Sequence, residues 1–366
     1  MRRGRFFAAL LGLALTATML NGTASADDRL SLAFARQAAG QRVVYSYPGL
    51  TPPESLLARI RAGEAAGVIF FGENVSSLTQ IRGVVQQLRA AAAQSPNQNP
   101  LLLMTDQEGG LIRRLPGAPA LSHKDVGLSA DPAAAATAAG RGAGENLAGV
   151  GMNVNLAPVL DVFHAPGDLM DQYERSFSAT ASVVGDLGTA YLSAQQAQGV
   201  AATVKHFPGL GKANAGDNTD SKPVTLSVPL TTLRGVDEVP YQDAIAAGAK
   251  LVMLSWAVYT ALDPNRPAGL SSTVIGQELR SRNGFTGVTI TDALEAGALS
   301  GYGSTGNRAV LAAQAGSDLI LASARDVGQG DQAADALAGA LADGTLDSGA
   351  FGQALARVNA LRASLP

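Results

Sequence analysis

Residues 201–209 read AATVKHFPG. The first half of this stretch is a short apolar run with a β-branched centre, which is typical of a parallel strand covered on both faces. The run ends in two polar side chains, Lys205 and His206, and Pro208 and Gly209 then favour a turn. The stretch therefore predicts a buried strand that carries polar groups at its C-terminal end.

Seven further runs have the same short, apolar character. The eight predicted strands are residues 42–45, 67–71, 101–105, 152–156, 201–205, 251–254, 287–291 and 318–321. Apolar residues at helical spacing lie between them, as at Leu78, Ile81, Val85 and Leu88. Strands that alternate with helices in this way favour a (β/α)8 TIM barrel, and an open doubly wound sheet of eight strands is the alternative.

Other features of the chain fit one barrel domain. Residues 333–341 and 351–361 predict outer helices that close the fold, and no low-complexity linker interrupts residues 30–361. Four glycines are expected near helix ends, where a left-handed cap costs glycine least. These are Gly67, Gly151, Gly199 and Gly316.

The composition excludes several classes of protein. The chain has 27 Lys and Arg against 30 Asp and Glu, a net charge of −3, so it lacks the basic excess of a nucleic-acid binder. It has no cysteine, which excludes disulfides and Cys-ligated zinc or iron–sulfur centres. A hydrophobic content of 46% is enough for a large core, so an intrinsically disordered chain is also excluded.

The first residues predict a cleavable signal peptide over residues 1–26. Arg2, Arg3 and Arg5 precede an apolar run over 6–20, and the small residues 24–26 then offer a cleavage site. Residues 27–366 would form the mature, secreted catalytic domain, without a stable membrane anchor or a lipid-bearing cysteine. An uncleaved membrane anchor is the alternative.

Polar residues follow four of the predicted strands. In a barrel these residues converge on the C-terminal face, where active sites of this fold lie. Among them are Asp106, Asp161, Lys205, His206 and Asp292. Any single one is equally well explained as a helix cap or a turn residue. Together, carboxylates beside hydrogen-bond donors favour cleavage of a glycosidic bond.

Three other chemistries fit the same residues less well. Lys205 resembles a Schiff-base lysine, but the adjacent His206 and the turn favour a clamp for hydroxyl groups. The histidines, His123, His164 and His206, lack metal-ligand spacing, so neither a metal nor a cofactor is predicted. Residues 301–306 match a dinucleotide fingerprint by letters only, since they do not directly follow a strand.

The sole tryptophan, Trp256, follows the sixth predicted strand. It would either stack on a sugar ring or pack in the core, and core packing is the more common role of a lone aromatic at such a place.

Several motifs, in this order, resemble glycoside hydrolase family 3, and in particular its single-barrel β-N-acetylglucosaminidase branch. They are DQEGG at 106–110, RSF at 175–177, KHFPG at 205–209, GFTGV at 284–288 and the strand that ends at Asp292. The resemblance implies that Asp292 is the nucleophile. It also implies that the hydroxyls of the terminal sugar are held by Asp106, Arg175, Lys205 and His206.

The chain departs from that branch on the leaving-group side. The family's Asp-Ser-His element supplies a histidine acid/base, but no histidine follows His206, and Thr219 is interpreted as standing at the catalytic position. Leu111, Leu210 and Trp256 also replace the arginine and histidines usual in the family. Asp217 or Asp220 is therefore the candidate acid/base, because threonine cannot supply a proton near neutral pH.

The resemblance implies a secreted retaining exo-β-glycosidase that hydrolyses terminal N-acetylglucosamine, or a glucose-type residue, of cell-wall or chitin-derived oligosaccharides. A glycoside phosphorylase on the same scaffold needs no carboxylate base and is an alternative. A catalytically weakened carbohydrate-binding protein is the other.

Overall fold

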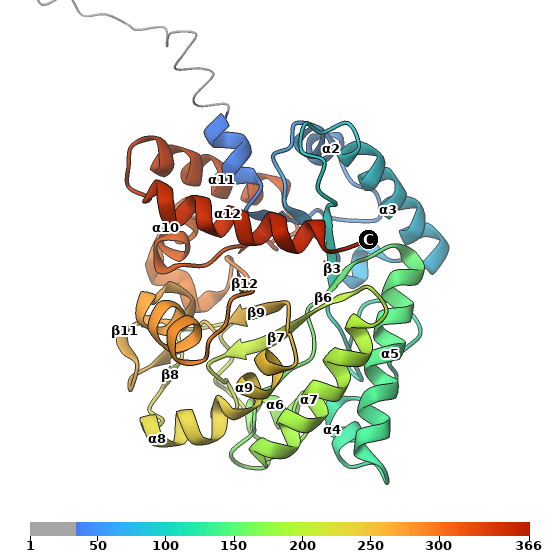
Figure 1. Ribbon diagram of the computed structural model, residues 1–366, viewed down its shortest axis with the longest axis vertical. Coiled ribbons are helices and arrows are strands. Elements are labelled where there is room, and N and C mark those ends of the chain that lie inside the picture. The colour runs from blue at the N-terminus through green and yellow to red at the C-terminus, as the bar shows by residue number, and fades with distance from the viewer. Residues whose placement is uncertain (1–33) are drawn as a thin grey trace, which may run out of the picture.

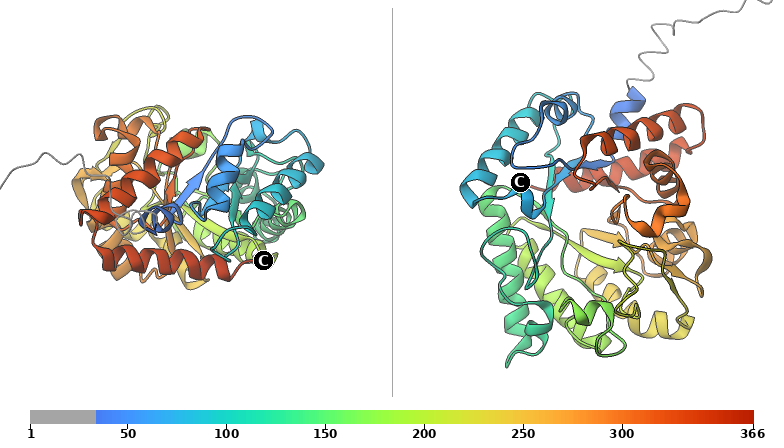
Figure 2. Two further views of the ribbon diagram at one scale, coloured as in Figure 1. Left: turned by 90° about the horizontal axis from the view of Figure 1, so that it is seen from above. Right: turned by 180° about the vertical axis from the view of Figure 1, so that it is seen from behind.

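The structure, a computed structural model, describes residues 34–366, so the predicted signal peptide lies outside the described residues. Eight parallel strands form one sheet in the order β12-β9-β7-β6-β3-β2-β1-β13. A parallel bridge between Ile290 and Leu319 joins the two ends of the sheet, which closes it. The strands and the helices around them make the predicted (β/α)8 barrel (Figures 1 and 2).

All eight predicted strands are present. They are β1 (Val43–Tyr45), β2 (Gly67–Ile69), β3 (Leu102–Thr105), β6 (Val154–Asn155), β7 (Ala201–Phe207), β9 (Leu251–Leu254), β12 (Val288–Thr291) and β13 (Ile320–Leu321). Most are shorter than predicted. β7 instead runs two residues further than predicted, so that His206 and Phe207 also belong to the strand.

Helices connect the strands and cover the barrel. The larger ones are α2 (Glu54–Arg61), α3 (Leu78–Ala92), α5 (Pro132–Val150), α7 (Ala181–Gln196), α9 (Val239–Ala246), η4 (Thr273–Arg282), α10 (Thr305–Ala315), α11 (Val327–Ala342) and α12 (Ser348–Ala363). The predicted closing helices are confirmed as α11 and α12. Both lie on the outside of the barrel near the helical residues 34–40 (Figure 1). No helix within residues 34–366 is both long and apolar enough to cross a membrane.

Alternation along the strands divides the core into an inner and an outer layer. In β9, Leu251 and Met253 join the cluster that fills the barrel, whereas Val252 and Leu254 pack beneath the surrounding helices. Successive side chains of a strand point to opposite faces, so strands buried on both faces must be apolar throughout. This is why continuous apolar runs predicted the strands.

The glycine prediction is correct at three of four positions. Gly151, Gly199 and Gly316 have the positive φ of a left-handed cap. Gly67 was predicted wrongly, because it is the first residue of β2 and its φ is not positive. A Cβ there would lie 2.3 Å from the carbonyl oxygen of Leu102, so glycine allows the close approach of β3.

Two glycines of α11 provide a test of the packing between this helix and β1. A Cβ on Gly330 would lie 2.2 Å from Cδ1 of buried Tyr45, whereas a Cβ on Gly339 would meet nothing within 4 Å. Gly330→Ala is expected to lower the free energy of unfolding by about 1–3 kcal/mol through overpacking. Gly339→Ala should raise it by up to about 1 kcal/mol through helix propensity. Urea denaturation of both variants measures the difference, and equal midpoints would contradict the packing.

Candidate functional site

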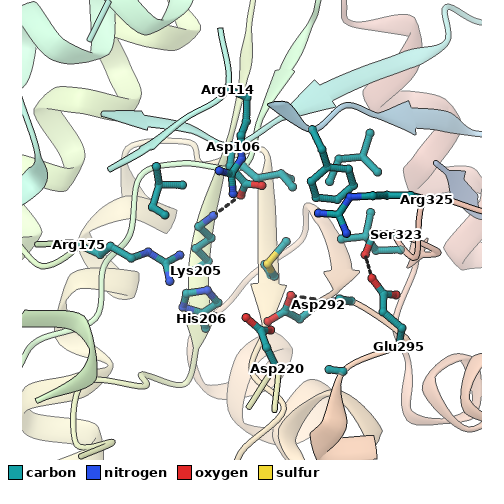
Figure 3. A pocket seen from close by; sticks show the side chains of 18 residues that line it. Asp106, Arg114, Arg175, Lys205, His206, Asp220, Asp292, Glu295, Ser323 and Arg325 are labelled. Atoms are coloured by element: carbon teal, nitrogen blue, oxygen red, sulfur yellow. Dashed lines mark hydrogen bonds and ion pairs between the residues drawn. The ribbon is translucent and has the colours of Figure 1, made fainter. Parts of the chain in front are cut away.

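A cavity of about 350 Å³ opens at the C-terminal ends of the barrel strands (Figure 3). It brings together five residues that the sequence placed at one site, from four separate segments of the chain. They are Asp106 after β3, Arg175 before α7, Lys205 and His206 in β7, and Asp292 after β12.

A buried ion cluster forms one wall of this cavity. The Nζ of Lys205 lies 2.7 Å from Oδ1 of Asp106 and 2.7 Å from Oε1 of Glu108. Arg175 donates two hydrogen bonds to the Glu108 carboxylate, at 2.9 and 2.8 Å. Burial favours the neutral form of Glu108, but Arg175 and Lys205 outweigh it and hold the pKa of Glu108 well below its usual range.

The same cluster determines the protonation state of Lys205. Burial alone would lower its pKa, but Asp106 and Glu108 raise it above the ordinary value, so the amine is a protonated ammonium. A Schiff-base lysine must instead be free to lose its proton. The geometry therefore fits a hydrogen-bond donor to hydroxyl groups and disfavours the Schiff-base alternative.

A second buried carboxylate fixes His206. The Nδ1 of His206 lies 2.7 Å from Oδ2 of Asp161, which is completely buried. The other oxygen of Asp161 accepts hydrogen bonds from the backbone N–H groups of His206 and Leu210, at 3.2 and 2.6 Å. Asp161 thus fixes the position of the His206 imidazole and of the backbone at the start of the loop that follows β7.

Asp292 is a partly buried carboxylate that faces the cavity. Its oxygen Oδ1 accepts a hydrogen bond from the N–H of Ala293 at 2.8 Å. Burial raises the pKa of Asp292, His206 lowers it, and the negative charge of Asp220 raises it again, so that the net shift is upward. Asp220 is therefore an electrostatic neighbour of Asp292, as Figure 3 also shows.

The two candidate acid/base residues lie in different surroundings. Asp220 lines the cavity beside Asp292. Asp217 lines neither this cavity nor a second hollow that adjoins it and is described below. Its carboxylate contacts Asn214 Nδ2 at 2.7 Å and Lys222 Nζ at 3.2 Å. Asn214 and Lys222 also lower the pKa of Asp217, which opposes a role as proton donor.

A second hollow, of about 290 Å³, adjoins the first and shares its central residues. The shared residues are Ile112, Arg175, His206, Asp220 and Asp292. Thr219, which was predicted to stand at the histidine position of the family, lines this second hollow and is buried.

Several residues of the first cavity were not predicted from the sequence. They are Phe71, Arg114, Glu295, Ser323 and Arg325. Ser323 and Arg325 follow the eighth predicted strand, and Phe71 ends the second, so a search for functional side chains after every strand would have found them. The Nε of Arg114 is buried without a hydrogen-bond partner among residues 34–366.

Other residues considered from the sequence lie away from the cavity. Trp256 is buried, and its Nε1 donates to the carbonyl of Ala293 at 2.9 Å, so it belongs to the core and does not offer a stacking face. His123 packs between Phe177 and Tyr191, and His164 contacts Asp237 at 2.8 Å. Residues 301–306 span the end of the short helix η5 (Gly297–Tyr302) and the start of α10, and not a strand-to-helix turn.

The ion cluster predicts a large effect of Glu108→Gln. The variant leaves two buried cations without their shared counter-charge, so the free energy of unfolding should fall by about 3–5 kcal/mol at pH 7. Because folding lowers the pKa of Glu108, this stabilisation is complete above the unfolded value of about 4.3 and is lost as the pH falls toward the folded value.

Denaturant unfolding at several pH values provides the measurement. The difference between wild type and Glu108→Gln should narrow below about pH 4.3, the pKa of an unfolded glutamate. Glu145→Gln, an exposed position on α5, is the control and should unfold like the wild type. A difference of the same size at every pH would contradict the assignment.

Comparison with known proteins identifies the family. The profile described as "Glycosyl hydrolase family 3 N terminal domain" matches residues 46–361. An uncharacterized secreted glycosyl hydrolase of Arthroderma benhamiae is 46% identical over 89% of this chain and 93% of its own length. A β-hexosaminidase of Xanthomonas axonopodis pv. citri is 34% identical over 70% of this chain and 75% of its own length.

Solved structures agree with the sequence matches. A family 3 β-N-acetylglucosaminidase from a Paenibacillus species superposes with a TM-score of 0.84 at 34% identity, over 90% of this chain but only 62% of that protein. A β-N-acetylhexosaminidase from Beutenbergia cavernae gives a TM-score of 0.81 at 32% identity, over 90% of this chain and 98% of that protein. The fold, the motifs and these matches agree, and the chain is a member of glycosyl hydrolase family 3.

Proposed function

We propose that the protein is a retaining exo-β-glycosidase that removes a terminal β-linked N-acetylglucosamine or glucose-type residue through a covalent bond to Asp292. The observation that carries the proposal is the pairing of two carboxylates, Asp292 and Asp220, in one cavity beside a buried cluster of hydrogen-bonding groups. Retaining glycosidases need this combination of a nucleophile, an acid and a clamp for the sugar.

The charge balance of the cavity fits a neutral sugar. Four carboxylates line it, and so do four cations: Asp106, Asp220, Asp292 and Glu295 against Arg114, Arg175, Lys205 and Arg325. Carboxylates accept from hydroxyl groups, whereas guanidinium and ammonium groups only donate. A polyhydroxylated ring supplies both donors and acceptors, so it can satisfy both kinds of group.

In the proposed mechanism, Asp292 and Asp220 divide the chemistry. The Asp292 carboxylate attacks the anomeric carbon while the bond to the leaving oxygen breaks, and Asp220 gives its proton to that oxygen. In the second step Asp220 takes a proton from water, whose oxygen displaces Asp292 from the anomeric carbon. A carboxylate beside the nucleophile favours this hydrolysis over attack by phosphate.

Asp106, Arg175, Lys205 and His206 are proposed to hold the hydroxyls of the terminal sugar. Lys205 and Arg175 are fixed by Glu108, and His206 by Asp161, so these donors need little reorganisation when the sugar binds. The relatives favour N-acetylglucosamine as that sugar, and the name of the Arthroderma relative, with the predicted signal peptide, favours export.

The proposed nucleophile is tested by Asp292→Asn. Turnover of 4-nitrophenyl N-acetyl-β-glucosaminide should fall by about 10⁴-fold or more, because the amide cannot form the glycosyl ester. A 5-fluoro glycosyl fluoride should label Asp292 of the wild type in a peptide mass spectrum, and it should not label the variant. Asp186→Asn, on the exposed face of α7, is the control and should retain activity and labelling. Substantial turnover by Asp292→Asn would contradict the proposal.

The proposed acid/base is tested by Asp220→Asn beside Asp217→Asn. The first variant should lose about 10²–10⁴-fold on a methyl glycoside, which needs a proton on its leaving group. Asp220→Asn should lose far less activity on a 2,4-dinitrophenyl glycoside, because this leaving group departs without a proton. Added azide should restore the turnover of the variant. Asp217→Asn should act on both substrates like the wild type. A larger loss in Asp217→Asn would assign the role to that residue.

The pH profile of Asp220→Asn gives a second readout of the same prediction. Asp292 must be ionised to attack, so activity falls as the pH drops through its pKa. Removing the negative charge of Asp220 removes one cause of the raised pKa of Asp292. The acid limb for the dinitrophenyl substrate should therefore move to lower pH, and an unchanged limb would show that the two groups do not interact.

A further inference from the structure

The second hollow is lined by fewer charged residues than the first. It shares Asp292, Asp220, Arg175 and His206 with the first cavity, but it contains neither Asp106 nor Lys205. It therefore extends from the two carboxylates away from Asp106 and Lys205. Six residues line the second hollow and not the first, and four of them are apolar or aromatic: Leu169, Met170, Tyr173 and Leu210, beside the polar Asn218 and Thr219.

Hydrogen bonds of the backbone hold this apolar lining in place. The N–H of Leu169, at the start of the short helix α6 (Leu169–Gln172), donates to the carbonyl of Ala213 in the loop after β7, at 2.9 Å. The N–H of Leu210 is bound by Asp161, the same carboxylate that fixes His206. The walls of the hollow are thus tied to each other and to the barrel.

A strained turn separates the apolar wall from the sugar clamp. Glu174 has a φ of 58°, which a residue with a side chain rarely adopts. It stands between Tyr173, which lines only the second hollow and is 41% exposed, and Arg175, which lines both. The turn therefore joins the aromatic residue of the second hollow to an arginine that lines both cavities.

We infer that this hollow is the leaving-group subsite and that it selects glycosides whose aglycone is apolar and aromatic. The inference rests on the proposed function, because the leaving oxygen must lie near both Asp292 and Asp220, and the second hollow is where the chain beyond that oxygen would go. Tyrosine, methionine and leucine side chains give an aromatic ring favourable contacts and little hydrogen bonding.

The charged groups of the hollow disfavour an acidic leaving group. Both Nε and Nη2 of Arg175 already donate to Glu108, and the Nδ1 of His206 is engaged by Asp161. Asp220 and Asp292 would repel a carboxylate at this place. An anionic aglycone would therefore be repelled by the two carboxylates, and the charge of Arg175 is already balanced by Glu108.

Thioglycosides test the inference by binding alone, since they resist hydrolysis. Calorimetry would compare methyl, 2-phenylethyl and 2-carboxyethyl 1-thio-β-N-acetylglucosaminides with the full-length wild-type protein. We expect the phenylethyl compound to bind about tenfold more tightly than the methyl compound, as for an added apolar group in a hydrophobic pocket. The carboxyethyl compound should bind no more tightly than the methyl one.

Variants localise the effect. Tyr173→Ala should reduce the preference for phenylethyl over methyl by at least threefold, and Tyr173→Phe should retain it. Leu128→Ala, at an exposed leucine that lines neither hollow, is the matched control and should leave both affinities unchanged. Circular dichroism and thermal melts would confirm that each variant is folded.

Two outcomes would overturn the inference. One is equal affinity of the wild type for the phenylethyl and methyl compounds, and the other is tighter binding of the carboxyethyl compound. Hydrolysis of 4-nitrophenyl N-acetyl-β-glucosaminide is measured in parallel. Its absence, together with the expected thioglycoside preference, would contradict the proposed function and leave the apolar subsite supported.

Discussion

The site depends on the ion pairs that the carboxylate of Glu108 makes with Lys205 and Arg175. This carboxylate is buried, and it binds cations from two distant parts of the chain, Lys205 in β7 and Arg175 in the loop before α7. Without this negative charge the two cations would be buried against each other, at a high cost in free energy. With it, both are held at the mouth of the barrel, and Lys205 still reaches Asp106.

A second buried carboxylate holds the next residue of β7. Asp161 lies on the segment after β6 and binds the ring of His206 and the backbone of Leu210. The two carboxylates therefore fix consecutive residues of one strand, Lys205 and His206, which both line the first cavity. These contacts exist before any ligand binds. The free energy needed to arrange the polar groups is therefore supplied by folding and does not reduce the free energy of binding.

The sequence predicted the strands well and the buried charges poorly. Parallel strands covered on both faces must be apolar, so the runs were visible without any contact information. Gly67 was assigned wrongly because a glycine that allows close strand packing looks like a glycine that caps a helix. The part played by Glu108 was missed, because its partners lie 67 and 97 residues away in the chain and only the folded barrel brings them together.

The choice between Asp217 and Asp220 shows the same limit at short range. Both lie in one loop rich in glycine and asparagine, and nothing in their residue types separates them. The path of the loop distinguishes the two residues. The N–H groups of Gly297 and Ala298 donate to the carbonyls of Asp220 and Thr219, at 2.8 and 3.0 Å, and this ties the end of the loop to the segment after Asp292. Asp217 precedes that anchor and pairs with Lys222 instead, so a backbone contact between two loops determines which carboxylate faces the nucleophile.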